Sequence, residues 1–138
     1  MPTNLNPYLS FKDNARRAME FYQTAFGGKL TLSTFKEFHA SDDPSEGEKI
    51  MHAVLEAENG ITFMASDTPN QMEYRPGSNI SMSLSGDSET ELRAYFEKLS
   101  AGSTVTMPLE KAPWGDTFGM CTDQFGVNWM VNVSTRQV

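Results

Sequence analysis

Apolar and polar positions recur along the chain in an order that predicts two similar halves. In the first half, alternation over residues 6–11 predicts a strand, and apolar residues at helical spacing over residues 15–26 predict a helix. Asp13 or Asn14 is expected to cap this helix, and Gly27 and Gly28 to end it. Three further strands are predicted at 29–39, 51–57 and 61–67, with an acidic, solvated loop at 40–48.

The second half repeats this order after a connector. A strand is predicted at 79–84, a helix from Ser88 to about Ser100, and three short strands near 104–107, 116–122 and 127–133. Ser88 and Glu91 have the spacing of a capping box. The buried stripe of the second helix is expected to consist of Leu92, Tyr95, Phe96 and Leu99.

The two halves also match as sequences. Segment 9–11 aligns with 82–84, 21–22 with 95–96, and 60–64 with 126–130. Each half of about 65 residues is short for independent stability, so we expect the halves to share a core or to pair through their sheets. The predicted organisation is one domain, 1–138, with module one at about 4–67, a connector at 68–77 and module two at about 78–133.

Composition and charge remove several classes of function. The 138 residues carry 18 acidic and 11 basic side chains, a net charge of −7 without a basic cluster, so nucleic acid is not an expected partner. No apolar run is long enough to span a membrane and no secretory signal is visible, so a cytoplasmic protein is expected. Cys121 has no second cysteine for a disulfide, and with two histidines it cannot complete a Cys/His zinc site.

Several short motifs, in order and spacing, carry a resemblance to a known family. They lie at 7–11, 18–22, 26–28, 51–53, 64–67, 113–115 and 123–129 and together cover about 6–133. On these motifs the chain resembles the PhnB-like branch of the vicinal-oxygen-chelate superfamily, also called the glyoxalase/bleomycin-resistance/dioxygenase superfamily.

The resemblance implies an α+β fold of two tandem βαβββ modules that form a curved mixed sheet around a concave cavity, with helices on the outer face. It also implies a homodimer. In the family's metalloenzymes, the first and last strands of each module supply His or Glu ligands to a divalent metal. The corresponding positions here are Asn6, Met64, Asn79 and Met130. Amides and thioethers are poor ligands for such a metal, so we expect no metal and no cofactor, and these residues to line the pocket instead.

Four other residues are candidates for the site. His52 and Glu56 lie four positions apart on a predicted strand and therefore project to one face, where they could act as a general acid and base. The turn at Asn59-Gly60 sets that register, and a shift of one residue would turn both side chains outward. Trp114 precedes a strand near the expected cavity mouth and could stack on a flat ligand, and Tyr8 could line the cavity. Trp129 and Cys121 are expected in the core.

The function predicted from these observations is the binding of a small organic ligand by a PhnB-like protein that lacks the family's divalent metal. Asn6, Tyr8, Met64, Asn79, Trp114 and Met130 are the expected ligand contacts. One alternative is an enzyme, of lyase, isomerase or dioxygenase-like type, that uses His52 and Glu56. Another is a resistance-type protein that sequesters a drug. No glycine turn of a Rossmann cofactor site is present, so methyl transfer is not expected.

Overall fold

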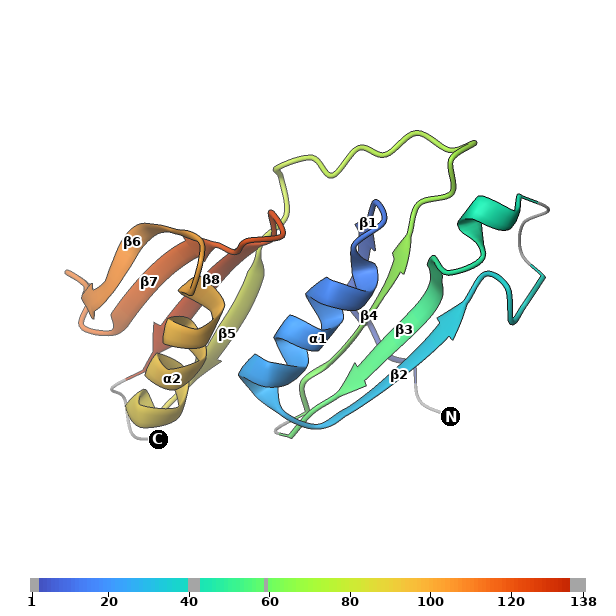
Figure 1. The fold of residues 1–138 in the computed structure, drawn as a ribbon. Coiled ribbons are helices and arrows are strands. Elements are labelled where there is room, and N and C mark those ends of the chain that lie inside the picture. The colour runs from blue at the N-terminus through green and yellow to red at the C-terminus, as the bar shows by residue number, and fades with distance from the viewer. Residues whose placement is uncertain (1–2, 40–42, 59, 135–138) are drawn as a thin grey trace. The chain divides into compact units, whose positions relative to one another are not determined.

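The computed structural model describes residues 3–39, 43–58 and 60–134, and the chain divides into two compact units (Figure 1). Unit 1 is Met1–Pro76 and unit 2 is Gly77–Val138. Each unit has its own four-stranded mixed sheet and one long helix, in the order strand, helix, three strands. This confirms the α+β class and the tandem βαβββ modules that the repeat predicts.

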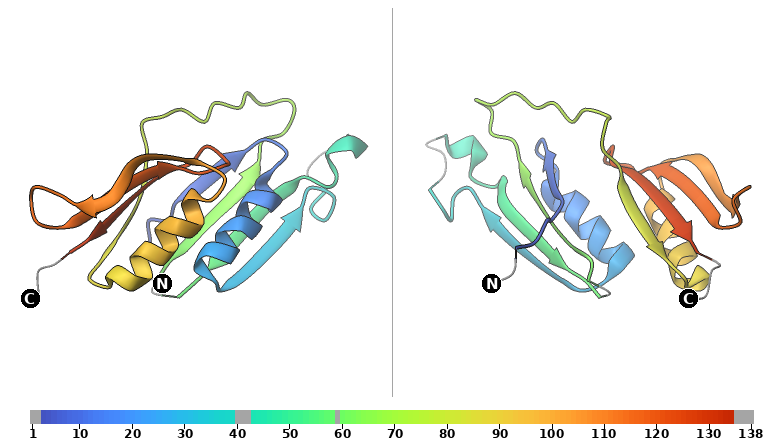
Figure 2. Two further views of the ribbon diagram at one scale, coloured as in Figure 1. Left: turned by 60° about the vertical axis from the view of Figure 1, so that its left-hand side comes forward. Right: turned by 180° about the vertical axis from the view of Figure 1, so that it is seen from behind.

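Unit 1 is built from β1 (Tyr8–Phe11), α1 (Ala15–Phe26), β2 (Lys29–Thr34), β3 (Ile50–Glu56) and β4 (Thr62–Asp67), with a short 3-10 turn η1 (Pro44–Glu46) before β3. The strand order is β1-β4-β3-β2, in which β1 runs parallel to β4 and the other neighbours are antiparallel. Helix α1 packs against β2, β3 and β4 and covers one face of the sheet (Figures 1 and 2).

The apolar stripe of α1 forms half of the unit 1 core, as its helical spacing predicts. The buried members of the stripe are Ala15, Ala18, Met19, Tyr22, Ala25 and Phe26. The Tyr22 and Phe26 rings meet Phe63 of β4 edge to face, with ring centroids 5.5 and 6.2 Å away. The chain leaves the helix through Gly27 and Gly28, both at positive φ. A Cβ on Gly28 would collide with the backbone of Glu56, so only glycine fits this crossing.

Two expectations for unit 1 need correction. Strand β2 ends at Thr34 and not at His39, because the chain turns there: the Glu37 N–H donates to Thr34 Oγ1 at 3.2 Å. The acidic loop is not simply solvated either, because Glu46 is 5% exposed and accepts a hydrogen bond from the Asn70 N–H at 2.8 Å. The phenylalanines at 35 and 38 continue the Thr-, Phe- and Leu-rich composition of the strand, and no local pattern distinguishes Glu46 from its exposed neighbours. Asn59 of the predicted Asn59-Gly60 turn lies outside the described residues, while Gly60 adopts φ 75°.

Unit 2 consists of β5 (Met82–Gly86), α2 (Glu89–Ser100), β6 (Thr104–Lys111), β7 (Thr117–Thr122) and β8 (Asn128–Val133), in the strand order β5-β8-β7-β6. The predicted cap is present, since the Glu91 N–H donates to Ser88 Oγ at 3.3 Å. Trp129 and Cys121 are buried, as predicted, at 2% and 1% exposed. Tyr95 is only half-buried, so the buried stripe of α2 is narrower than expected and consists of Leu92, Phe96 and Leu99.

The strand registers also correct the alignment of the two halves. Tyr8 is the Cα partner of Met64, whereas Ser83 is the partner of Met130. The Thr68 N–H donates to Phe11 O, and in the same way the Ser134 N–H donates to Gly86 O. Structurally, β1 therefore matches 83–86 and not 81–84, so the aligned segments 9–11 and 82–84 are out of register by two residues. The shift preserves the alternation of faces, which is why the sequence pattern alone did not reveal it.

Candidate functional site

In unit 1, the sheet face opposite α1 carries four of the eight predicted site residues. We call it the unit 1 open face. Alternation along β3 buries Ala53 and Leu55 on the helix side and turns the intervening residues to the other side. The members of the unit 1 open face on β1, β3 and β4 are Tyr8, Ser10, His52, Val54, Glu56, Thr62, Met64 and Ser66.

Tyr8, His52 and Met64 come together on this face. Tyr8 is paired with Met64 across β1 and β4, and Met64 is paired with Val54 across β4 and β3. The Tyr8 and His52 rings approach to 5.9 Å between centroids, tilted by 42°. Tyr8 is 49% exposed, while His52 and Met64 are half-buried. Among the described residues, none donates to or accepts from the His52 imidazole, so both ring nitrogens are available to a bound molecule.

His52 and Glu56 share the open face, as their spacing predicts, but they are separate groups. Val54 lies between them on β3, and four residues of strand span about 13 Å. Glu56 is exposed at the end of the strand, where it is paired with Thr62 and Lys29. The two groups could therefore act on opposite ends of one ligand, but not as a directly hydrogen-bonded pair.

Asn6 and Asn79 both lie outside the strands. Asn6 is exposed and precedes β1, and Asn79 is exposed and precedes β5. Because Met82 is the first residue of β5 and pairs with Trp129, Asn79 is not opposite Met130. The expectation that Asn79 sits on the first strand of its module is therefore wrong, because that strand begins three residues later.

In unit 2, the face opposite α2 carries more thioether groups than the unit 1 open face, and we call it the unit 2 open face. Its members on β5, β7 and β8 are Ser83, Ser85, Phe118, Met120, Thr122, Asn128, Met130 and Asn132. Met120 and Met130 are direct cross-strand partners. Trp114, in the turn between β6 and β7, is 59% exposed and meets Phe118 at 5.6 Å between ring centroids. Methionines beside exposed aromatic rings form an adaptable apolar surface.

The residues at the family's metal positions do not fit a divalent metal. Asn6 and Asn79 offer neutral amides, and Met64 and Met130 offer thioethers, none of which is a strong ligand for zinc, nickel, iron or manganese. Within the described residues, no group of three or more His, Cys, Asp and Glu side chains converges as metal ligands would. His52 is the one imidazole among the described residues of the unit 1 open face. We therefore assign no chemical step to a metal.

Cys121 belongs to the core and not to the site. Burial raises the pKa of its thiol to about 11, and the nearby Asp123 carboxylate adds to that shift. Asp123 itself has a structural role, because it accepts from the Phe125 and Val127 N–H groups of the β7–β8 turn and, at 2.8 Å, from Trp129 Nε1. A protonated, buried thiol is a poor nucleophile.

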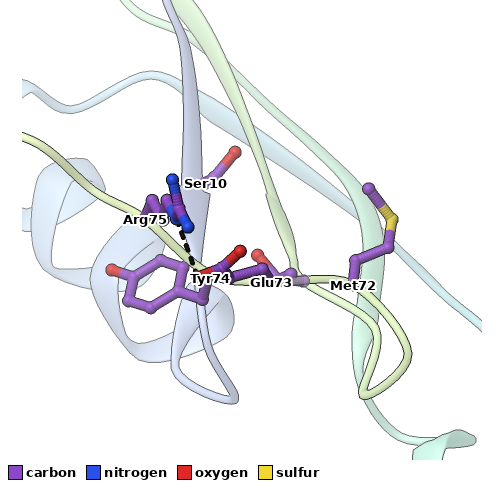
Figure 3. A pocket seen from close by; sticks show the side chains of 6 residues that line it. Ser10, Met72, Glu73, Tyr74 and Arg75 are labelled. Atoms are coloured by element: carbon purple, nitrogen blue, oxygen red, sulfur yellow. Dashed lines mark ion pairs between the residues drawn. The ribbon is translucent and has the colours of Figure 1, made fainter.

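The sequence did not reveal a pocket beside the connector. Six residues line it: Ser10, Thr68, Met72, Glu73, Tyr74 and Arg75 (Figure 3). Its volume is about 370 Å³. The connector residues have no periodic pattern, and only the proximity of Ser10 makes them part of a pocket.

The fold of the two βαβββ units is that of a glyoxalase-type protein. The family model of the Glyoxalase/Bleomycin resistance protein/Dioxygenase superfamily matches residues 4–131, and the chain belongs to this superfamily. Among the described residues, no helix is both long and apolar enough to cross a membrane.

Several particular relatives are similar along nearly the whole chain. The YjdN protein of Escherichia coli K12 is 30% identical, covering 96% of this chain and 97% of the relative. The crystal structure of PA1353 from Pseudomonas aeruginosa is 38% identical with a TM-score of 0.81, covering 96% of this chain and 98% of that one. A Bacillus cereus PhnB protein, described as a candidate 3-demethylubiquinone-9 3-methyltransferase, is 26% identical with a TM-score of 0.74, covering 96% and 100%.

Proposed function

We propose that the protein binds a small organic ligand on the unit 1 open face without the family's divalent metal. One observation carries this proposal: the half-buried His52 imidazole lies 5.9 Å from the Tyr8 ring and has no hydrogen-bond partner among the described residues. The His52 nitrogens are not fully buried, so a ligand hydrogen bond there would replace bonds to water in a partly apolar setting.

The neighbours of His52 suggest what the ligand needs. Tyr8 and Met64 offer apolar surface to a flat or irregular molecule, and Ser10 and Ser66, which are paired across β1 and β4, add hydroxyl groups at the edge. A few polar groups within an apolar lining are typical of small-molecule sites. The ligand would thus have a ring or short apolar body with one group that bonds to imidazole.

A ligand screen by thermal shift, followed by calorimetric titration of the hits, tests this function. His52→Asn should weaken binding of a hit at least about tenfold, the effect of one good hydrogen bond at a desolvated site. His39→Asn is the matched control, because His39 is exposed in the turn after β2 at φ 49°, a conformation that asparagine tolerates. Equal loss in both variants, or no loss in His52→Asn, would contradict the assignment.

An enzymatic role is the second candidate, and the shared face of His52 and Glu56 favours it. A neutral imidazole transfers protons well near pH 7, and Glu56 lies about 13 Å along the same strand. Such an enzyme would need a substrate long enough to reach both groups. The enzymatic role would be established if the wild type turns over a screened ligand and Glu56→Gln binds that ligand without turning it over.

Sequestration of a drug is a third candidate, favoured by the exposed Trp114 against Phe118. A panel of flat aromatic drugs would quench Trp114 fluorescence if this surface binds them. Lack of quenching by every compound would count against this role.

The homodimer implied by the family resemblance is part of the proposal. Light scattering after size-exclusion chromatography should give twice the monomer mass of 15.4 kDa.

A further inference from the structure

The connector between the two modules forms one wall of a pocket whose other wall is β1. Thr68 directly follows β4, and Met72, Glu73, Tyr74 and Arg75 lie further along the connector (Figure 3). At about 370 Å³ the pocket lies at the lower end of the range for small-molecule sites. It is distinct from the His52 neighbourhood, with which it shares only the β1 residue Ser10.

The first residues of the connector, 68–72, form specific hydrogen bonds although they contain no helix or strand. The Thr68 N–H donates to Phe11 O at 2.7 Å, and the Met72 N–H donates to Pro69 O at 3.0 Å. Between them, the Asn70 N–H donates to the buried Glu46 carboxylate at 2.8 Å. Asn70 Oδ1 also accepts from Lys49 Nζ at 2.8 Å. The bonds of Thr68 and Asn70 fix this part of the connector to the body of unit 1, and the Met72 bond to Pro69 turns the connector locally, so the following residues start from a defined place.

The charge in the pocket comes from one ion pair. Arg75 Nε lies 2.7 Å from Glu73 Oε1, the contact drawn as a dashed line in Figure 3. Both side chains are well exposed, at 78% and 68%, so this pair contributes little to folding and can be displaced. No described residue other than Glu73 bonds to Arg75, which leaves its terminal Nη groups available.

We propose that this connector pocket binds a small carboxylate ligand, with Arg75 as the residue that recognises the anion. The two Nη groups form the planar fork that matches a carboxylate with two parallel hydrogen bonds. Ser10, Thr68 and Tyr74 supply hydroxyl groups, and the Tyr74 ring and the Met72 thioether each add apolar surface to the lining. Since the net charge of the chain is −7, capture of an anion depends on this local geometry and not on long-range attraction.

Benzoate is a suitable probe, because it combines one carboxylate with a flat apolar ring. Benzamide, of nearly the same shape but without charge, is its control. Titration of the full chain, followed by the side-chain Nε–Hε signals of arginine and the backbone amides of 72–75 in NMR spectra, should show saturable shifts with benzoate and none with benzamide at equal concentration. No saturable shift with benzoate would overturn the proposal.

Arg75→Gln should weaken benzoate binding at least about tenfold, and Arg75→Lys, which keeps the charge but loses the fork, should weaken it less, by roughly threefold. Arg93→Gln is the matched control, because Arg93 forms a comparable exposed ion pair with Glu89 at 3.3 Å on α2. Equal weakening in Arg75→Gln and Arg93→Gln would mean non-specific attraction and would overturn the site. If His52→Asn weakens benzoate binding and Arg75→Gln does not, the function proposed for the unit 1 open face stands and this pocket assignment is wrong.

Discussion

The Asp67 carboxylate at the end of β4 caps helix α1 from a distance of 52 residues in sequence, since Asp67 Oδ1 accepts from the Ala15 N–H at 2.9 Å. Its second oxygen accepts from the Ile50 N–H, at the start of β3, at 2.8 Å. Asn14, the residue at the N-cap position, makes no side-chain cap bond to the described part of the helix, so the buried Asp67 fills that role. One carboxylate thus joins three elements of unit 1 beneath its open face.

Asp67→Ala should lower the free energy of unfolding by about 3 kcal/mol, because it leaves two buried backbone N–H groups without acceptors and removes a negative charge from a helix N-terminus. Urea denaturation followed by circular dichroism measures the change. Asp87→Ala, at an exposed position before α2, is the control and should change stability by less than about 0.5 kcal/mol. A similar small effect in Asp67→Ala would contradict the capping role.

The ion pairs of the Lys49 ammonium group predict that the free energy of unfolding falls at high pH. Its Nζ lies 3.0 Å from Asp13 Oδ1 and 3.2 Å from Glu46 Oε2. Burial alone would lower the pKa of Lys49, but these bonds outweigh it and the net shift is upward from 10.5. A group whose pKa is raised in the folded state stabilises the fold fully below its unfolded pKa, and that contribution is lost as the pH rises through the folded pKa.

Lys49→Met should therefore cost roughly 3 kcal/mol at pH 8, because the buried Glu46 carboxylate loses the cation of its ion pair. The difference in unfolding free energy between the wild type and Lys49→Met should shrink above pH 10.5, measured by urea denaturation at a series of pH values. Lys98→Met, on the exposed side of α2, serves as the control. A difference that stays constant up to about pH 11.5 would exclude this linkage.

The sequence predicted helices and strands well where a hydrophobic periodicity defines them. It predicted the burial of single residues less well where contacts distant in sequence determine it. The α1 stripe, the shared face of His52 and Glu56, and the burial of Trp129 follow from local spacing, and the structure confirms them. The burial of Glu46 could not be predicted in this way, because it depends on Asn70, which is 24 residues away. The pocket near Arg75 depends in turn on which strand the connector passes.

The same reasoning explains the error in the repeat register. Serine occupies alternate positions of 81–85, so the segment fits β1 equally well after a shift of two residues. The strand registers, together with the hydrogen bonds from Thr68 to Phe11 and from Ser134 to Gly86, select one alignment. Any residue carried onto β5 from the family pattern is therefore sensitive to this shift, as Asn79 illustrates.

The two tryptophans should be distinguishable in solution. Trp114 is 59% exposed, whereas Trp129 is 2% exposed and bonded to Asp123. Iodide should quench only part of the emission of the wild type, and Trp114→Phe should retain a blue-shifted emission that iodide hardly quenches. Strong quenching of Trp114→Phe in folded protein would contradict the burial of Trp129.

Cys121 should be unreactive in the folded protein. Its thiol is 1% exposed and its pKa is raised to about 11, so about one molecule in a thousand carries the thiolate at pH 8. Iodoacetamide should alkylate it only in urea concentrations that unfold the chain. Thr24→Cys in a Cys121→Ala background, on the exposed side of α1, should react without urea and serves as the control. Equal rates for the two cysteines in buffer would contradict the structure.

The absence of strong metal ligands at the family positions makes a prediction about metal. Because Asn6, Met64, Asn79 and Met130 offer only amides and thioethers, protein purified without chelator should contain no stoichiometric zinc, nickel, iron or manganese. A metal bound by the folded protein, at a free concentration about 100 times its dissociation constant, would add about 2.7 kcal/mol to the free energy of unfolding. This would raise the melting temperature by several degrees. Chelator should therefore leave the melting temperature unchanged within about 1 °C, as measured by differential scanning calorimetry. Stoichiometric metal that is lost in His52→Asn would instead place a metal at the unit 1 open face and overturn the metal-free function proposed for it.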